Sequence, residues 1–429
     1  MARTGYILAC NSGSSSLKIS LYRLADSGPS LRPVLASSIS NITSPPAQFI
    51  FSSEDDAVSK YSKDEEVENI SDHASAFTHF LSVLENDTTV SRHDLVQICH
   101  RVVHGGAYSH PVIINDKTLH YIERLSDLAP LHNGPALAII QTCLDTIYNA
   151  NSIAFFDTMF HHTLPSHVRT YPIDQKVALE RGLRKYGFHG LSYASILRSV
   201  AEFLDRPESN LNLIVLHLGS GASICAIKQG KSYDTSMGLT PLNGLPGATR
   251  SGAVDPSLIF HYTNKAGKIS HDPKFASDLR VTEAETVLNS QSGWKALTGT
   301  QDFGLVSKRA KEGSKADKLA FDLLVDRILG YIGSYYVKLS GKVDAVVFSG
   351  GIGEKAVDLR RVVADNLECL SFAPVDESAN ANASSTADQV SEIGMKSGDG
   401  SRRLLVCKTD EQYEMAYQCI RTEEFWKEI

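Results

Sequence analysis

The stretch ILACNSGSSSLKISLY at residues 7–22 decides the fold, and LIVLHLGSGASICAIK at 213–228 repeats its pattern near the middle of the chain. Each is an apolar run, a tight turn of Gly and Ser, and a second apolar run, which predicts a β-hairpin. A turn of such small residues can direct several backbone N–H groups and hydroxyls at one phosphate. An ordinary hairpin is the alternative for either stretch alone. Two copies favour two related domains that close on one nucleotide or polyphosphate.

Bulk properties limit the kinds of protein this can be. The chain has 429 residues, 42% of them hydrophobic, which suits two domains of about 150–250 residues. No apolar stretch approaches the roughly 18 residues of a membrane span, and the first residues lack a secretory signal, so we expect a cytoplasmic protein. The formal net charge of −7 disfavours nucleic acid as the main partner. Seven widely spaced cysteines without a CxxC pattern predict buried thiols in a reducing compartment.

The remaining segments alternate between strand-like and helix-like patterns, which predicts an α/β protein in two duplicated halves. We expect helices at 74–85, 135–148 and 315–339, and strands at 95–103, 152–162, 213–218 and 344–349. The helix at 315–339 has a broad apolar face that includes Leu319 and Tyr331, which fits either a subunit interface or burial within the domain.

Two polar stretches predict structure outside this alternation. Residues 26–70, rich in Ser, Pro and Asp, predict an exposed elaboration of the first hairpin, and residues 376–389 a mobile surface loop. We place the domain boundary after residue 160. The predicted domains are 1–160 and 161–411, and a C-terminal helix at 412–429 joins the first.

Polar residues follow the predicted strands of the first half. Asn11 lies at the turn of the first hairpin, and Lys18 follows on the returning strand. Arg101 falls where a strand gives way to a Gly–Gly turn, where it could grip a carboxylate or phosphate with two parallel hydrogen bonds. A surface salt bridge is the alternative for Arg101. Asp157 ends an apolar run, the usual place for a metal-directed carboxylate in an α/β sheet.

Several histidines are candidates for ligand contacts. His132 precedes a predicted helix and is either a ligand contact or a capped turn, and His217 belongs to the second hairpin. His189 lies between two glycines, where it is either structural or a donor to charge that develops on a moving phosphoryl group. His161 and His162 do not predict a zinc site, because neighbouring residues of a strand point to opposite faces.

The second half holds one conspicuous arginine and a second glycine turn. The segment 234–256 contains four glycines and three prolines, and Arg250 is its only cation, which predicts a shaped loop close to a ligand. A strand, a glycine turn and the start of a helix are predicted for residues 346–355, VVFSGGIGEK. This arrangement favours the binding of a nucleotide. Glu411, at the start of the last helix, is a second carboxylate for a bound magnesium ion.

The motifs NSGSSSLK, HRVVHGG, APLHN, FDTMFH, KYGFHG, HLGSGAS, DTSMG, TRSG, FSGGIGE and TDE, in this order over nearly the whole chain, resemble those of the acetate kinase family. That family belongs to the superfamily of actin, sugar kinases and the Hsp70 ATPase domain. The resemblance implies two duplicated actin-like (ribonuclease H-like) domains with a cleft between them. The Ser-rich first elaboration is similar to that of fungal members.

The resemblance also implies an activity and roles for the matched residues. The activity is reversible, magnesium-dependent and direct in-line transfer of the ATP γ-phosphoryl group to acetate, giving acetyl phosphate and ADP, in a homodimer. Arg101 and Arg250 would bind the phosphoryl group and the acetate carboxylate, while His189 would stabilise the transition state. Asn11 would contact the phosphoryl group and, with Glu411, the metal; Asp157 and Glu411 would orient magnesium or an arginine.

The other matched positions have three implied functions. They are His132 and His217 near the phosphoryl path; Val103, Leu131, Phe188 and Pro241 around the acetate methyl group; and Lys18, Gly219, Ser220, Gly221, Gly350, Gly351 and Gly353 around the nucleotide.

Three positions depart from the family pattern and bear on the phosphoryl donor. Ser220 and Lys355 stand where the family usually has Asn, and Gly304 stands where many relatives carry an arginine near the nucleotide. A pyrophosphate-dependent acetate kinase is therefore an alternative, although the intact GGIGE turn favours ATP. A propionate or butyrate kinase would share nearly every motif. A different class, an ATP-driven binding protein of the actin or chaperone kind, gives no reason for both Arg101 and Arg250.

Overall fold

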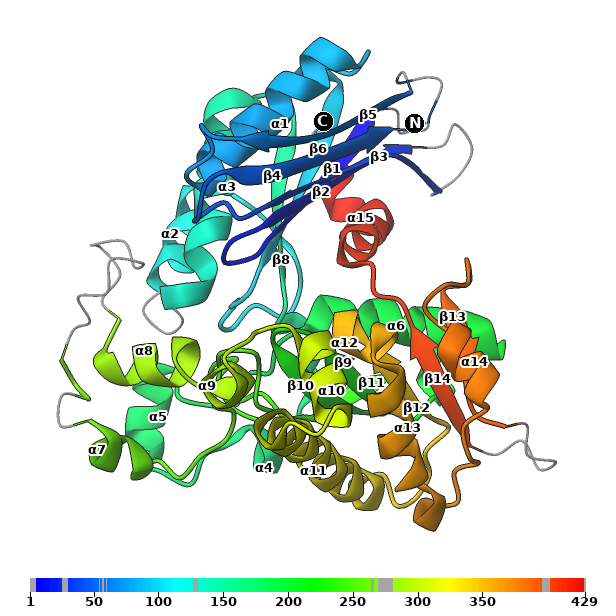
Figure 1. Cartoon of the computed structure of the whole chain (residues 1–429). Helices are drawn as coiled ribbons and strands as arrows, with labels where there is room; N and C mark the ends of the chain where they lie inside the picture. Colours follow the sequence, from blue (N-terminus) through cyan, green and yellow to red (C-terminus); the bar gives the residue numbers. More distant parts are fainter. Residues whose placement is uncertain are drawn as a thin grey trace. The chain divides into compact units, whose positions relative to one another are not determined.

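The computed structural model describes residues 5–24, 30–53, 55, 58, 60–125, 130–263, 266–268, 281–395 and 402–427, with only the backbone for 130–132. The chain divides into two compact units (Figure 1). Unit 1 comprises Met1–Met159 and Asp410–Ile429, and unit 2 comprises Phe160–Thr409. Each unit contains one mixed β-sheet with helices against it. The predicted α/β class is therefore confirmed.

In the described residues of unit 1, the strands form one sheet in the order β5-β4-β3-β2-β1-β6-β8-β7. The strands are β1 (Tyr6–Ser12), β2 (Leu17–Leu24), β3 (Leu31–Ser40), β4 (Ala47–Ser53), β5 (Tyr61–Val67), β6 (Leu95–Val102), β7 (Val112–Ile113) and β8 (Asn151–Phe156). The predicted first hairpin is β1 and β2, in which Asn11 pairs with Lys18. β1, β6 and β8 run parallel, so their carboxyl ends meet at one edge of the sheet.

The helices of unit 1 cover both faces of its sheet (Figure 1). They are α1 (His73–Asp87), η1 (Arg92–Asp94), α2 (Asp116–Leu125), α3 (Pro130–Thr146), α15 (Glu411–Arg421) and η5 (Glu423–Trp426). Successive residues of a strand face opposite sides, so Ile98 of β6 packs with α1 and α3, while Cys99 contacts the backbone of α15. The carboxyl-terminal helix is thereby packed on the sheet of unit 1.

Residues 26–70 are not merely an exposed elaboration, and that prediction was wrong. Their described part forms β3, β4 and β5, which extend the sheet beyond β2. In β4 every second residue is buried, and Phe49 and Phe51 are fully buried against α1. Serine is small enough to occupy the buried positions of a strand as well as the exposed ones. The Ser-rich composition therefore hid the alternation of buried and exposed residues.

In unit 2 the described strands form a second sheet in the order β11-β10-β9-β12-β14-β13. They are β9 (Leu213–Leu218), β10 (Ala222–Lys228), β11 (Lys231–Thr235), β12 (Ala345–Ser349), β13 (Val390–Glu392) and β14 (Arg403–Cys407). β10 is antiparallel to β9 and to β11, whereas β12 is parallel to β9 and to β14. The same pattern joins β3, β2, β1, β6 and β8 in unit 1, which confirms the predicted duplication.

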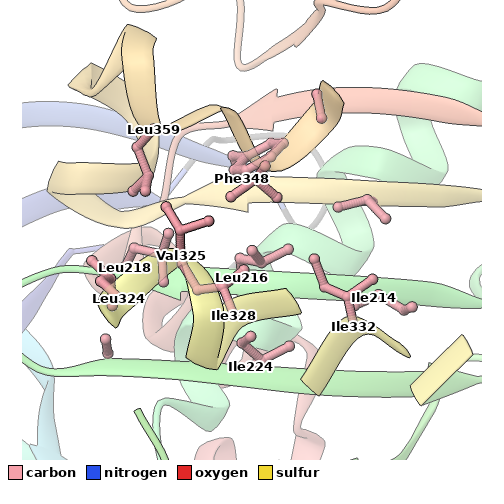
Figure 2. Close-up of a cluster of buried hydrophobic side chains, with 14 of the residues drawn as sticks. Ile214, Leu216, Leu218, Ile224, Leu324, Val325, Ile328, Ile332, Phe348 and Leu359 are labelled. Carbon is pink, nitrogen blue, oxygen red and sulfur yellow. The ribbon is translucent and has the colours of Figure 1, made fainter. Parts of the chain in front are cut away.

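The core of unit 2 lies between this sheet and α11 (Lys315–Lys338), as Figure 2 shows. Leu324, Ile328 and Ile332 of α11 point toward Leu216 of β9 and Phe348 of β12. On the other face of the sheet, Tyr193, Ile196 and Val200 of α6 (Gly190–Leu204) pack against alternate strand residues. Part of the apolar face of α11 is thus buried within its domain, one of the two alternatives predicted for it, whereas Leu319 is 56% exposed.

The remaining helices of unit 2 are mostly short (Figure 1). They are α4 (Ser166–Arg169), α5 (Gln175–Arg181), η3 (Glu208–Asn210), α7 (Leu258–Tyr262), α8 (Glu283–Ser290), α9 (Gly293–Thr298), α10 (Phe303–Lys311), α12 (Gly350–Lys355), α13 (Val357–Asp365), η4 (Glu368–Leu370) and α14 (Glu377–Asn382). Helix α14 corrects the prediction of a mobile loop at 376–389. Asp376 caps α14 by accepting a hydrogen bond from the Ala379 N–H, and Asn380 is buried, so the segment is ordered by polar rather than apolar contacts.

The predicted strand at 152–162 is too long. β8 ends at Phe156, and the helix η2 (Met159–Thr163) follows it. His161 and His162 therefore do not lie on a strand, and the reason given above against a zinc site is wrong. Six of the seven cysteines are buried free thiols and Cys369 is exposed, which confirms the cysteine prediction for all but one. Within the described residues, no helix combines the length and the apolar character that a membrane crossing requires.

Candidate functional site

Unit 1 places a polar cluster at the carboxyl edge of its parallel strands. Asn11 belongs to β1, Arg101 to β6, and Asp157 follows the last residue of β8. Because these three strands are adjacent and parallel, residues near their ends lie side by side. Asp410 caps α15 by accepting a hydrogen bond from the Tyr413 N–H, and this starts the helix so that Glu411 joins the cluster. We call these four residues the Arg101 cluster.

The guanidinium group of Arg101 is held from two sides. Its Nε and Nη2 donate to the two carboxylate oxygens of Asp157 at 3.0 and 2.6 Å, a bidentate pair. Nη1 donates to Asn11 Oδ1 at 2.8 Å and lies 3.4 Å from Glu411 Oε2. The Asn11 Nδ2 amide donates to the same Glu411 oxygen at 2.6 Å. The surface salt bridge considered for Arg101 is excluded, since its side chain is only 15% exposed and that of Asp157 1%.

Opposite charges dominate the electrostatics of this cluster. Burial by itself would lower the pKa of Arg101, but the carboxylates of Asp157 and Glu411 raise that pKa above its ordinary value. Arg101 is therefore fully charged at any physiological pH, with its orientation fixed. In this structure Asp157 holds Arg101, which is one of the two roles predicted for it.

Unit 2 builds a second cluster around the turn between β9 and β10. The backbone oxygen of Ser220, in that turn, accepts a hydrogen bond from the Ala248 N–H at 2.9 Å, and Gly247 N–H donates to the Arg250 oxygen at 3.0 Å. The first bond fastens the loop that carries Arg250 to the turn, and the second closes a turn within the loop. A Cβ added to Gly247 would lie 2.6 Å from the Ser220 oxygen, so the close approach requires glycine.

Arg250 and His189 both approach Gly221 of this turn. A Cβ placed on Gly221 would lie 2.8 Å from Arg250 Nη1 and 3.8 Å from His189 Nε2. The ring of His189 is 4.3 Å from that of His217 on β9, centroid to centroid. Burial lowers the pKa of Arg250 to about 10, so its guanidinium group is still charged at neutral pH. We call Arg250, His189, His217 and the turn Gly219–Gly221 the Arg250 cluster.

The backbone before α6 presents His189. His189 has φ 60° and ψ 25°, the left-handed conformation that side chains other than glycine seldom adopt. Just before it, the Phe188 carbonyl lies 2.9 Å from His161 Nε2, and Lys185 Nζ donates to Asp234 and to the Thr235 carbonyl, both at 3.0 Å. The surrounding structure thus fixes a strained residue, as is common where backbone geometry serves a site.

The glycine turn after β12 comes close to β9. Gly350 has φ 75°, and a Cβ there would lie 2.7 Å from the Leu218 oxygen. Gly351 faces open space, with nothing within 4 Å of an added Cβ among the described residues. Behind the turn, the buried Arg360 donates to the Gly353 oxygen at 2.9 Å and to Asn380 Oδ1 at 2.6 Å. The turn is therefore open on one side and supported on the other.

Comparisons with known proteins agree over the whole chain. A family model described as the acetokinase family matches residues 6–417. The chain belongs to the acetokinase family. It is 51% identical to a probable acetate kinase of Emericella nidulans, over 97% of this chain and 98% of that protein. It is 48% identical to a probable acetate kinase of Neurospora crassa, over 98% and 95%.

Solved acetokinase structures share the fold. A propionate kinase from Francisella tularensis has a TM-score of 0.81 and 33% identity, with 96% of this chain and 98% of that chain covered. The Porphyromonas gingivalis acetate kinase has a TM-score of 0.79 and 28% identity, with 99% and 100% covered. The actin-like fold and the family resemblance read from the sequence are confirmed.

The predicted acetokinase site residues fall into both units. Unit 1 gathers Asn11, Arg101, Asp157 and Glu411, and unit 2 gathers His189, His217, Gly219, Ser220, Gly221 and Arg250, with Gly350, Gly351 and Gly353 in the neighbouring turn. Lys18 is exposed on β2, and the methyl-pocket residues Val103, Phe188 and Pro241 are half-buried, buried and buried. The side chains of Leu131 and His132 lie outside the described residues.

The sequence reading missed the residues that support this acetokinase site. Arg360 is one, and Ser223 with Tyr193, behind His189, are two others. A signal for Tyr193 existed, because it follows His189 by four residues, one helical turn. Nothing local distinguishes Arg360 from an exposed helical arginine.

Proposed function

We propose that this protein is an acetate kinase that transfers the γ-phosphoryl group of ATP reversibly to acetate, giving acetyl phosphate and ADP. The observation that carries the proposal is the family match, which spans residues 6–417 and so includes both arginine clusters. Membership of the family makes the protein a kinase with a carboxyl group as acceptor. The assignment of each residue's role is part of the proposal.

The two clusters suit a reaction between two anions. Acetate is already a nucleophile and needs no general base, so the obstacle is its repulsion from a polyphosphate. Arg101 is preorganised by Asp157 and Asn11 to bind an anion without a change of orientation. Arg250 is half-buried, and its burial lowers the pKa of the guanidinium group, so an anionic ligand would stabilise its charge. We assign to both the binding of acetate and of the phosphoryl group, with direct in-line transfer between them.

Magnesium fits the Arg101 cluster as a partly protein-bound ion. Mg²⁺ commonly takes one or two carboxylates and completes its shell with water and substrate phosphates. In the part of the chain that the structure describes, no group of three or more His, Cys, Asp or Glu side chains forms a full cage. Glu411, beside Asn11, supplies the oxygen ligands that such a partial shell needs. When bound there with ATP, magnesium would neutralise phosphate charge.

ATP is the proposed phosphoryl donor and acetate the proposed acceptor. Gly350 and Gly351 keep the turn after β12 clear of side chains, as a nucleotide requires. Gly304 donates its N–H to Asp302 in the first turn of α10 and offers no cation to the nucleotide, so pyrophosphate is the alternative donor. Propionate is the alternative acceptor, favoured by the likeness to the Francisella tularensis propionate kinase.

A hydroxamate assay with each acceptor and donor tests these assignments. Acetate, propionate and butyrate are each supplied with ATP and then with pyrophosphate, in the presence and absence of magnesium. We expect acetate with ATP and magnesium to give the highest kcat/KM. Higher kcat/KM with propionate or pyrophosphate would replace acetate or ATP in the proposal. ATP hydrolysis that is slow and independent of every carboxylate would instead indicate an ATP-driven binding protein.

Single-turnover experiments test the direct transfer. With radiolabelled ATP and no acetate, we expect no phosphorylated enzyme. A phosphorylated enzyme that forms and decays at the catalytic rate would contradict in-line transfer.

The proposed assembly is a cytoplasmic homodimer, which the family resemblance supports. Light scattering on the purified protein should give twice the chain mass of 46.8 kDa. A mass equal to that of one chain at assay concentration would contradict the dimer.

A further inference from the structure

A buried chain of hydrogen bonds leads away from His189. His189 Nδ1 lies 2.8 Å from Ser223 Oγ, and the same oxygen lies 2.5 Å from the Tyr193 hydroxyl. Ser223 is on β10, and Tyr193 is one turn into α6. Both side chains are fully buried. Every polar atom of this chain therefore needs a partner inside the protein.

The positions of the protons follow from the number of donors. Among the described residues, Ser223 Oγ is the only hydrogen-bond partner of the Tyr193 hydroxyl. Burial raises the pKa of Tyr193 well above 10, so the phenol keeps its proton and donates it to Ser223. Ser223 has one proton, and its own remaining partner is His189 Nδ1. Nδ1 is then an acceptor, and the proton of the neutral imidazole is on Nε2.

Protonation of His189 would disrupt this arrangement of hydrogen-bond donors and acceptors. An imidazolium donates from Nδ1 to Ser223, which would turn the Ser223 hydroxyl toward Tyr193 and leave one buried hydroxyl proton without an acceptor. The Arg250 guanidinium, which approaches Gly221 together with His189 Nε2, also disfavours a second positive charge on the ring. The other described groups beside His189 include the ring of His217 from β9, Ser223 from β10 and Tyr193 from α6.

We propose that Ser223 and Tyr193 are positioning residues that hold His189 as the neutral imidazole with its proton on Nε2. Nε2, which approaches Gly221 beside Arg250, then donates a hydrogen bond to an oxygen of the transferring phosphoryl group. This inference rests on the proposed kinase function.

The same order of protons keeps His189 from acting as a nucleophile. The Nδ1 lone pair is engaged by Ser223, and Nε2 carries a proton, so neither nitrogen offers a lone pair to phosphorus. No bond forms between His189 and phosphorus, and no proton leaves the ring during the transfer. The supporting residues thus favour direct transfer between ATP and acetate over a phosphohistidine.

Nitrogen-15 NMR of the ligand-free wild-type protein tests the proton position. The spectra use histidine labelled at both ring nitrogens, and the His189 signals are identified by their absence in His189→Gln. At pH 7.5 we expect an Nε2 that carries a proton and an unprotonated Nδ1. A proton on Nδ1, or an imidazolium at this pH, would overturn the proposal.

Two variants test the contribution of the chain, with Tyr335→Phe as matched control. In Tyr193→Phe, Ser223 loses the donor that polarises its hydroxyl toward His189 Nδ1, so the neutral form of His189 is less stabilised and the pKa of His189 should rise slightly. In a plot of kcat against pH, the acidic limb should shift to higher pH together with the pKa of His189. In Ser223→Ala, both neutral tautomers should appear, and kcat should fall about 10-fold with KM nearly unchanged.

Tyr335 is also a buried tyrosine of unit 2, and its hydroxyl has no partner among the described residues. Tyr335→Phe should leave the His189 signals and the pH profile as in the wild type. Equal shifts in Tyr193→Phe and Tyr335→Phe would contradict the proposal.

The readouts separate this inference from the function on which it rests. A wild-type protein that is inactive with every carboxylate contradicts the proposed function, while the NMR result still supports the tautomer. Normal activity with the proton on Nδ1 contradicts the positioning role alone.

Discussion

Six strands of the eight-stranded sheet in unit 1, β3-β2-β1-β6-β8-β7, have the same order as the six-stranded sheet of unit 2, but the residues at their strand ends differ. In unit 1 the ends of β6 and β8 carry Arg101 and Asp157. At the corresponding end of β12, unit 2 has Ser349 and then Gly350, and its first turn is Gly219–Gly221 rather than the serine-rich turn after Asn11. The fold supplies equivalent positions, and the side chains decide whether charge or empty space is placed there.

The two arginines show the same contrast. Arg101 belongs to the sheet and is matched by two carboxylates, which raise its pKa. Arg250 belongs to a loop, and burial lowers its pKa to about 10. Ion pairs therefore dominate the pKa of Arg101, whereas burial dominates the pKa of Arg250. Removing each should have different consequences.

The largest effect should come from Arg101→Ala. The variant leaves the buried Asp157 without its bidentate partner, and removing one member of a buried pair costs about 3 kcal/mol or more in the free energy of unfolding. Urea unfolding at pH 7.5 measures this loss. Activity should fall as well, because Asn11 loses the group that orients its amide.

Arg92→Ala is the control within the same unit. Arg92 pairs with Glu85 at 2.6 Å, but both side chains are about a third exposed, at 31% and 27%. Its loss should cost about 1 kcal/mol or less. Equal losses in the two variants would mean that the Arg101 cluster is no more structural than a surface pair.

Arg250→Ala should chiefly affect catalysis. We expect kcat to fall by at least about 10²-fold, the usual scale for losing a donor that stabilises charge in the transition state. Steady-state assays with acetate and ATP measure it, after circular dichroism has shown that the variant is folded. Arg206→Ala, which removes a half-exposed arginine paired with Asp344, is the control. An unchanged kcat in Arg250→Ala would remove Arg250 from the site.

The strand ends were predictable because they depend on local patterns. Apolar runs that stop at Arg101 and Asp157 identify two neighbouring strands, and parallel neighbours must end together. The role of Asp157 could not be settled in the same way. Whether a carboxylate meets a metal or an arginine depends on register across strands, and residues 56 positions apart supply the bidentate pair.

The structural predictions were wrong where one sequence pattern hid another. The serines of β3 and β4 masked a strand period, and the polar stretch at 376–389 is ordered by the cap of α14 and by the buried Asn380 that binds Arg360. Hydrophobic periodicity cannot detect such polar packing. For the same reason, sequence patterns identified His189 as a candidate but not Ser223, which bonds its ring, or Tyr193, which bonds the Ser223 hydroxyl.

A pH-dependent loss of stability should occur in both units. Each contains a fully buried histidine bonded to a serine: His100 with Ser152 and His161 with Ser232. Burial lowers the pKa of His100 to about 3 and that of His161 to about 4. Below pH about 6.5 the unfolded chain binds protons that the native state does not, so stability is present above this pH and falls on acidification.

Between pH 7.5 and 5, each of these histidines should reduce the free energy of unfolding by about 2 kcal/mol. Urea unfolding over this range should show a shallower pH dependence in His100→Gln and in His161→Gln. His110→Gln, which replaces an exposed histidine, is the control. If the free energy of unfolding depends on pH in both variants as it does in the wild type, burial does not keep either histidine neutral in the native protein.

The smallest expected effect concerns the acceptor. Val103, which follows β6 two residues after Arg101, is half-buried and is assigned to the acetate methyl group. Val103→Ala enlarges that space, and because one methylene in an apolar pocket is worth about 1–3 kcal/mol, the kcat/KM ratio of propionate to acetate should rise about 10-fold. Val102→Ala, at a fully buried position with core neighbours, tests whether any loss of volume here has the same effect. A ratio that rises equally in both, or in neither, would place the acetate methyl group away from Val103.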